Sequence, residues 1–278
     1  MFAGSSKFVF FTGKGGVGKT TMAAATAVEL SRRGHDVLLT TTDPAAHLGA
    51  TLGAEVPNLE VERIDPVAET ARYRANVLAT RGRGLDAEAL AALQEDLRSP
   101  CTEEVAVFHA FSKAVSQSRR RFVVMDTAPT GTLLLLDATG SYHHEVLRHA
   151  NPAMRGRTIT PLMLLQDAAH TKVIIVTLPE TTPILAAAEL QEDLRRAGVE
   201  PWAWVINSSL AASGTKHPLL AARAVAERGH LERLERDGLA RRLAVVPMLV
   251  TEPVGPAGLR GVAHPAEETV RVPACAGG

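Results

Sequence analysis

The sequence has few cysteines and no long apolar run, and each absence excludes a class of protein. Only Cys101 and Cys275 occur in 278 residues, and they are too few and too far apart for a disulfide framework or a zinc module built on paired cysteines. No stretch approaches the ~20 apolar residues that a membrane-spanning helix needs, and the N-terminus has no signal-peptide pattern. We therefore expect a cytoplasmic protein that does not insert into membranes and meets the inner face of one only through a partner.

A surplus of positive charge is also absent. Lys and Arg together number 30 and Asp and Glu together number 30, so the formal net charge is +0 at pH 7. A protein that coats nucleic acid uses excess cations to neutralise phosphates, so we expect no nucleic-acid partner. What remains is an ordinary globular balance, with 46% hydrophobic and 22% charged residues, which suffices to bury a core.

Six short apolar runs rich in Val, Ile and Phe indicate β-strands. Most of them lack an alternation of apolar and polar residues, which is typical of strands buried on both faces of a parallel sheet. The runs span residues 7–12, 36–41, 121–126, 172–178, 202–207 and 243–248. Helical segments lie between most of them, and those at 20–33 and 181–197 each end at a glycine. The pattern predicts an α/β fold with a doubly wound, mostly parallel sheet flanked by helices.

Two stretches depart from the alternation of strands and helices. Residues from about 66–120 and 141–171 form longer helical or mixed segments, which we expect to make a helical subdomain inserted on one side of the sheet. Both belong to one predicted domain that spans residues 1–264. Residues 265–278 carry Pro, Gly, Glu and Ala with little periodicity, so they are predicted to form a flexible tail.

A glycine-rich loop follows the first predicted strand and precedes a predicted helix. Its residues fit the pattern G-x-x-x-x-G-K-[ST], in the context that a phosphate-binding loop requires. They are Gly13, Lys14, Gly15, Gly16, Val17, Gly18, Lys19 and Thr20. Glycines let backbone N–H groups turn toward phosphates, Lys19 can reach the β- and γ-phosphates, and the Thr20 hydroxyl can bind Mg²⁺. The alternative is a plain turn, but motif and context together predict a site for ATP and Mg²⁺ that includes the next residue, Thr21.

A carboxylate ends the predicted strand 121–126. Asp126 follows four apolar residues, and an aspartate at the end of a buried strand is costly unless a metal or hydrogen-bond donors satisfy it. We therefore expect Asp126 to share the Mg²⁺ site with Thr20. The alternative for such a residue is a helix cap or a turn.

Lys14 is the most specific residue of the loop, because an ordinary phosphate loop needs no second lysine there. The run G-K-G-G-V-G-K-T resembles the deviant Walker A motif of the dimeric SIMIBI-class ATPases. The resemblance implies that Lys14 reaches the partner's nucleotide across a dimer, as an arginine finger does. It also implies that Asp43 orients the attacking water and that Asn207 recognises adenine, with Pro247 beside it. An asparagine or aspartate after a strand is also common turn chemistry.

Further segments resemble the arsenite pump-driving ATPase (ArsA) family, and are most similar to the second half of its long, two-half form. They are residues 63–66, 97–104, 133–140 and 177–183, and the resemblance ends at about residue 263. It implies an ATPase coupled to arsenite or antimonite efflux through a membrane permease, working as a homodimer or with a homologous half.

Two related functions remain as alternatives. A targeting ATPase for tail-anchored membrane proteins would need a Met-rich apolar groove, but the chain has only 6 Met and no C-x-x-C motif. A ParA/MinD-type partition ATPase would need a basic surface or a basic amphipathic C-terminal helix, and residues 262–278 have no such pattern.

Cys101 is the candidate ligand for trivalent arsenic or antimony. Ser99 suits an N-cap, Pro100 the first helical position, and Glu103 and Glu104 the first turn, so Cys101 is predicted at a helix N-terminus, where the thiolate form is favoured. Thiolate is the ligand that soft metalloids prefer. The alternative is a small buried cysteine, and it is the resemblance that assigns Cys101 to the metalloid.

Two departures from the family pattern concern this metalloid site. In the family, the motif D-T-A-P-T-G is followed by a histidine, whereas here Gly131 is followed by Thr132. His143 and His144 could substitute for it, or could form a polar helix face. One thiolate per chain also gives a symmetric dimer fewer than the three sulfurs that trivalent arsenic often takes, so Cys275 or another ligand would have to complete the site.

Overall fold

The computed structural model describes residues 6–43, 45–99, 101–127, 139 and 159–263. Several predicted features therefore lie outside the described residues. They are Pro100, the segment after Thr127 with Gly131 and Thr132, the histidines His143 and His144, Cys275 and the tail 265–278.

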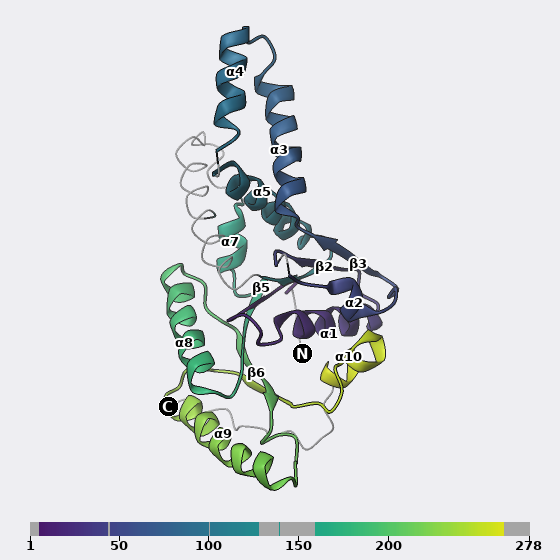
Figure 1. The fold of residues 1–278 in the computed structure, drawn as a ribbon, viewed down its shortest axis with the longest axis vertical. Coiled ribbons are helices and arrows are strands. Elements are labelled where there is room, and N and C mark those ends of the chain that lie inside the picture. The colour runs from purple at the N-terminus through teal and green to yellow at the C-terminus, as the bar shows by residue number, and fades with distance from the viewer. Residues whose placement is uncertain (1–5, 44, 100, 128–138, 140–158, 264–278) are drawn as a thin grey trace.

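Within the described residues, seven strands form a single sheet in the order β3-β2-β4-β1-β5-β6-β7, and every pairing is parallel. The strands are β1 (Phe8–Thr12), β2 (Val37–Thr41), β3 (Leu59–Arg63), β4 (Phe122–Asp126), β5 (Thr171–Thr177), β6 (Ala203–Ser209) and β7 (Leu243–Pro247). The structure confirms the doubly wound α/β fold and the six predicted strands. Helices cover both faces of this sheet (Figure 1).

The sequence analysis missed strand β3 at one edge of the sheet. Its sequence, L-E-V-E-R, alternates apolar and charged residues, unlike the continuous apolar runs of the central strands. An edge strand has a neighbour on one side only, and Val61 in β3 remains 43% exposed. The search for strands buried on both faces therefore passed over it.

Side chains along the strands point alternately to the two faces of the sheet, where they form two separate apolar cores. Val9 and Phe11 of β1 pack with helices on one face, whereas Phe8 and Phe10 pack with helices on the other. The first face carries α1 (Lys19–Arg32), α2 (Leu48–Leu52) and α10 (Gly255–Ala263). The second face carries α5 (Cys101–Gln117), α7 (Pro161–Gln166), α8 (Thr181–Arg196) and α9 (Pro218–Arg236). The predicted helices at 20–33 and 181–197 correspond to α1 and α8.

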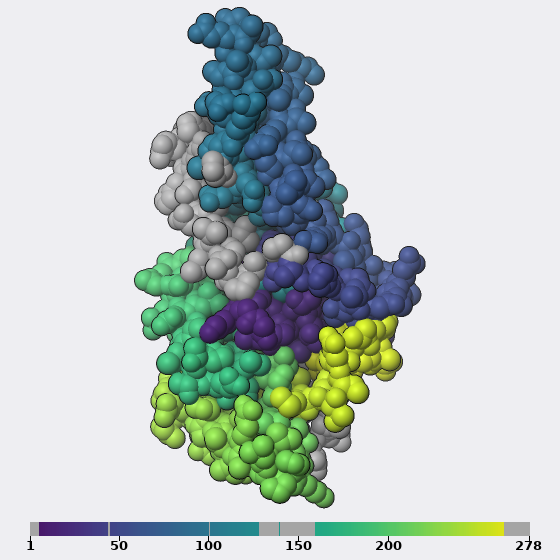
Figure 2. Space-filling model, in the orientation of Figure 1, coloured from purple at the N-terminus to yellow at the C-terminus, as the bar shows by residue number. Residues whose placement is uncertain are grey.

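Two further helices, α3 (Pro66–Arg81) and α4 (Ala87–Asp96), rise side by side away from the sheet as an arm (Figure 1). The Asp65 carboxylate caps α3 by accepting hydrogen bonds from the backbone N–H groups of Val67 and Ala68, and Pro66 occupies the first helical position. Helix α4 buries none of its residues, and the arm projects from the body of the molecule (Figure 2).

The arm and α5 lie where the first part of the helical insertion is expected. That residues 66–120 and 141–171 form one subdomain, within one domain of residues 1–264, stays a prediction. Of all the helices in the described part of the chain, none is both long and apolar enough to cross a membrane.

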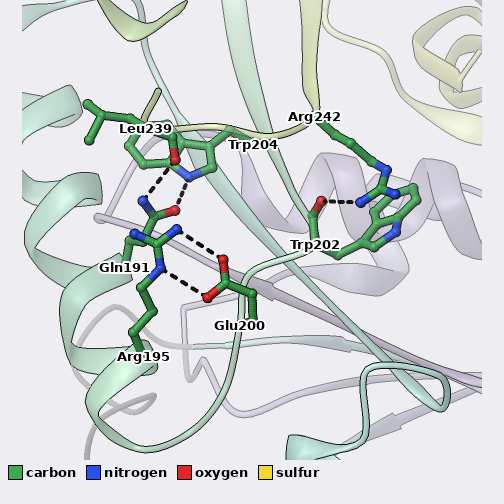
Figure 3. A network of polar contacts seen from close by, with 7 residues as sticks. All are labelled: Gln191, Arg195, Glu200, Trp202, Trp204, Leu239 and Arg242. Carbon is green, nitrogen blue, oxygen red and sulfur yellow. Dashed lines mark hydrogen bonds and ion pairs between the residues drawn. The ribbon is translucent and has the colours of Figure 1, made fainter. Parts of the chain in front are cut away.

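A buried amide ties β6 and the approach to β7 to helix α8 (Figure 3). Gln191 is 2% exposed and Trp204 is 1% exposed. The indole N–H of Trp204 donates to Gln191 Oε1 at 2.8 Å, and Gln191 Nε2 donates to the Leu239 carbonyl at 2.8 Å. Buried polar groups need such partners, so this network fixes the position of α8 against the sheet.

Candidate functional site

The predicted site residues gather at the carboxyl edge of the sheet. Strand β1 lies between β4 and β5, and in the register of the sheet Phe11 and Thr41 both stand opposite Asp126. Because all strands run parallel, the loops after β1, β2 and β4 leave from the same edge. This is where open α/β sheets bind ligands.

The loop after β1 has a backbone that only glycine accommodates at two positions. Gly13 has φ 143° and Gly18 has φ 92°, and neither position has room for a side chain. A Cβ atom on Gly13 would overlap the Val176 carbonyl, and one on Gly18 would overlap the Asn207 amide. The glycines therefore allow the loop to pass close to β5 and β6 before α1 begins.

Lys19, the first residue of α1, is only 5% exposed. Its ammonium group donates to the Lys14 carbonyl oxygen at 3.0 Å. Burial lowers the pKa of Lys19, and the nearby carboxylates of Asp126 and Asp43 oppose that shift. The Lys14 side chain is exposed, so one lysine of the loop faces inward and the other faces solvent.

Asp126 connects the phosphate loop to the ends of β2 and β4. It is fully buried, and its Oδ2 atom accepts hydrogen bonds from the hydroxyls of Thr20 at 2.6 Å and Thr41 at 3.3 Å. Burial is the main cause that raises the pKa of Asp126, whereas the bond from Thr20 and the charge of Lys19 act in the opposite direction.

Asp126 Oδ1 and Thr40 Oγ1 are buried without a hydrogen-bond partner. Buried polar atoms are normally paired, so the orphaned carboxylate oxygen beside the Thr20 hydroxyl fits a hard, oxygen-seeking cation such as Mg²⁺. The sequence analysis did not single out Thr41, because its place opposite Asp126 follows from the pairing of β2 with β4.

Asp43 lies just beyond β2 and is half-buried. Its backbone N–H donates to the Thr41 hydroxyl at 3.0 Å, and its carboxylate accepts from the Ala45 N–H at 2.9 Å. Asp43 therefore has the turn geometry that is the alternative to a role in orienting water. Its charge also acts on both Lys19 and Asp126, which places it in the same electrostatic environment.

Asn207 lies two residues before the end of β6, and Pro247 is the last residue of β7. The Asn207 amide donates to the Val17 carbonyl of the phosphate loop at 2.9 Å, so the structure brings the predicted base-recognising residue to the loop. Pro247 stands opposite Ser209 in the register. Thr21 follows Thr20 in the first turn of α1 and is half-buried.

Cys101 is the first residue of α5 and is exposed, which rules out the alternative of a buried cysteine. Its backbone N–H donates to the Ser99 hydroxyl at 3.4 Å, and Glu103 and Glu104 lie in the first turn as expected. In the residues that the structure describes, no three His, Cys, Asp or Glu side chains gather closely enough to hold a metal ion.

Comparisons with known proteins show which family the sequence resembles. The family model described as anion-transporting ATPase matches residues 6–163. An arsenical pump-driving ATPase of Escherichia coli is 57% identical over 248 residues, which cover 89% of this chain and 42% of that protein. The chain thus spans less than half the length of this curated relative.

Two other relatives differ in how much of them is matched. A putative arsenical pump-driving ATPase 2 of Aquifex aeolicus is 30% identical over 282 residues, which cover 88% of this chain and 94% of that protein. An ATPase GET3 of Malassezia globosa is 37% identical over 142 residues, which cover 47% of this chain and 41% of that protein.

Proposed function

The chain belongs to the ArsA family of anion-transporting ATPases, and from this premise we propose that it binds ATP with Mg²⁺ and hydrolyses it in the service of an arsenical pump. One observation carries the proposal. The 2.6 Å hydrogen bond between Thr20 and the buried Asp126 joins the phosphate loop to the strand-end carboxylate, next to a carboxylate oxygen that has no partner. That arrangement suits a cation shared between a protein and phosphates.

In the proposed site, Lys19 and the backbone N–H groups of residues 13–20 hold the phosphates. Thr20 and Asp126 hold Mg²⁺, which when bound neutralises charge on the phosphate oxygens. Asp43 orients the attacking water, and Asn207 and Pro247 line the adenine. Thr41 keeps Asp126 in place through its hydroxyl bond.

The exposure of Lys14 supports a role toward a second subunit. We propose a dimer, formed by two copies or with a homologous half, in which Lys14 completes the partner's site as an arginine finger does. Lys14→Ala should then leave the Kd for ATP nearly unchanged and lower kcat by about tenfold or more. An unchanged kcat would remove Lys14 from catalysis. Lys7→Ala serves as the lysine control, because Lys7 precedes β1 and the loop follows the other end of that strand.

The metalloid is the proposed cargo or stimulating ligand. Cys101 presents an exposed sulfur at a helix N-terminus, which suits trivalent arsenic or antimony because thiolate binds soft ions. The closed, hydrolytic state of the dimer would be favoured by a metalloid that bridges two subunits. The proposed partner is an arsenite permease in the membrane, and the proposed location is the cytoplasm beside that permease.

Steady-state ATP hydrolysis by the purified, reduced protein, with and without antimonite, tests the proposal. Stimulation in the wild type that disappears in Cys101→Ser would support both the ATPase and the metalloid site. A flat response in both would leave the proposed ATPase activity standing and overturn the metalloid role of Cys101, which would then require a missing partner chain or a different cargo. Absence of hydrolysis under all conditions would overturn the proposed function as a whole.

A further inference from the structure

Helix α9 carries a buried carboxylate that the proposed chemistry does not use. Glu227 is 7% exposed, and its Oε2 atom accepts hydrogen bonds from the Ser209 hydroxyl at 3.0 Å and from the Ala211 N–H at 2.9 Å. A buried carboxylate is costly unless it is well bonded. Its two donors belong to the end of β6 and to the turn that follows.

Ser209 is the residue at which several chain segments meet. It is fully buried, and its hydroxyl oxygen also accepts from the Ala212 N–H at 3.2 Å. Its backbone carbonyl accepts from the Met248 N–H at 2.9 Å, directly after Pro247, the residue that stands opposite it in β7. The bond from Ser209 to Glu227 therefore anchors the ends of both β6 and β7 to α9.

The backbone just before Ser209 is irregular. The register between β6 and β7 shifts between Ile206 and Ser209, and Ser208 lies in the left-handed region with φ 56°. Such bulges redirect side chains, and here the redirected residue is Asn207, whose amide meets the Val17 carbonyl. A non-glycine residue at positive φ is unfavourable unless its surroundings hold it.

We propose that Glu227 is a positioning residue for the nucleotide base. By holding Ser209 and Ala211, it keeps the bulge in the conformation that points Asn207 toward the phosphate loop and holds Pro247 beside it. In the part of the chain that the structure describes, Glu227 hydrogen-bonds Ser209 and Ala211 and neither the phosphate loop nor Asp126, so it acts on the base side only. This inference rests on the proposed function, because it assumes that Asn207 and Pro247 line a base.

The experiment compares two ligands, ATP and inorganic tripolyphosphate, by calorimetric titration in the presence of Mg²⁺. Only ATP has a base, so Glu227→Ala should raise the Kd for ATP by roughly tenfold, about 1.4 kcal/mol, and change that for tripolyphosphate by less than about twofold. Glu227→Gln keeps an oxygen that can accept both bonds and should recover most of the ATP affinity. Glu232→Ala, at an exposed position of the same helix, is the matched control and should have no effect.

Three results would overturn the inference. Glu227→Ala could weaken the binding of ATP and tripolyphosphate equally, it could leave the Kd for ATP unchanged, or Glu227→Gln could fail to recover the ATP affinity. If Glu227→Ala does not fold, Ser209→Ala removes the same link with the loss of one hydroxyl, and a selective loss of ATP affinity of about threefold is expected. Failure of the wild type to bind ATP would instead refute the proposed function, so the two failures are distinguishable.

Discussion

Replacing Asp126 with asparagine should stabilise the protein while abolishing its response to Mg²⁺ and nucleotide. The carboxylate is fully buried and one of its oxygens has no partner. Leaving a buried charged oxygen unsatisfied costs about 1–3 kcal/mol or more. Asparagine removes the charge but keeps one oxygen that can accept the bonds from Thr20 and Thr41. Those bonds lose their charge assistance, which offsets part of the stabilisation. We therefore expect Asp126→Asn to raise the free energy of unfolding by a net amount of about 2 kcal/mol, which corresponds to a rise in Tm of about 4 °C for a chain of this size.

The pH dependence of this gain has a defined sign. Burial raises the pKa of Asp126 in the folded state above its ordinary value of 3.8. Between pH 3.8 and that folded pKa, the folded state keeps a proton that the unfolded state has lost. Stability of the wild type therefore falls as the pH rises from 3.8 to the folded pKa, and the penalty is complete above it. The advantage of Asp126→Asn should therefore be smallest at and below pH 3.8 and should reach its full size above the folded pKa of Asp126.

Scanning calorimetry without nucleotide, and then with Mg²⁺ and ADP, measures both effects. The wild type should gain Tm with the ligand, whereas Asp126→Asn should start higher and gain little. Asp65→Asn, which replaces one good helix cap with another, is the matched control and should change Tm by less than about 1 °C. A lower Tm for Asp126→Asn at pH 7 would refute the reasoning. It would mean that the attraction between the Asp126 carboxylate and Lys19 stabilises the fold by more than the burial of the charge destabilises it.

Three further outcomes are expected. Gln191→Leu removes the partner of the buried Trp204 indole N–H and of the half-buried Leu239 carbonyl and should lower the free energy of unfolding in urea by about 2–4 kcal/mol, whereas the exposed Glu192→Leu should hardly change it. Gly13→Ala should lower Tm far more than Gly16→Ala, because only at the first position would the added Cβ meet a backbone carbonyl; equal losses would contradict this. Burial lowers the pKa of His170 from 6.5, so the wild type should lose stability as the pH falls below 6.5, and His170→Gln should flatten that loss between pH 7.5 and 5.5.

The sequence predicted those features that depend on local pattern. The central strands are continuous apolar runs, and the phosphate loop is a fixed spacing of glycines and lysines, so both were recognised without knowledge of the fold. Strand β3 was missed because an edge strand resembles an exposed alternating segment. Glu227 was missed because its neighbours in the helix are small and charged residues, and nothing local indicates that its carboxylate is buried against a strand 18 positions away.

The electrostatic part of the site was predictable only in outline. A strand ending in aspartate indicated Asp126, but the bond from Thr41 depends on the register between β2 and β4. Likewise, the contact between Asn207 and Val17 spans 190 positions. Such contacts follow from the order of strands in the sheet, which a pattern of residues along the chain does not specify.

The base of the helical arm lies next to the carboxyl edge of the sheet, where the proposed nucleotide site is. Helix α3 starts two residues after Ile64, whose N–H donates to the Thr41 carbonyl, and Thr41 itself bonds Asp126. With 16 residues and a rise of about 1.5 Å for each, α3 is about 24 Å long. A rotation of about 10° at its base would therefore carry its far end through about 4 Å, so a slight reorientation of the segment at Ile64 would be greatly enlarged at the far end of α3.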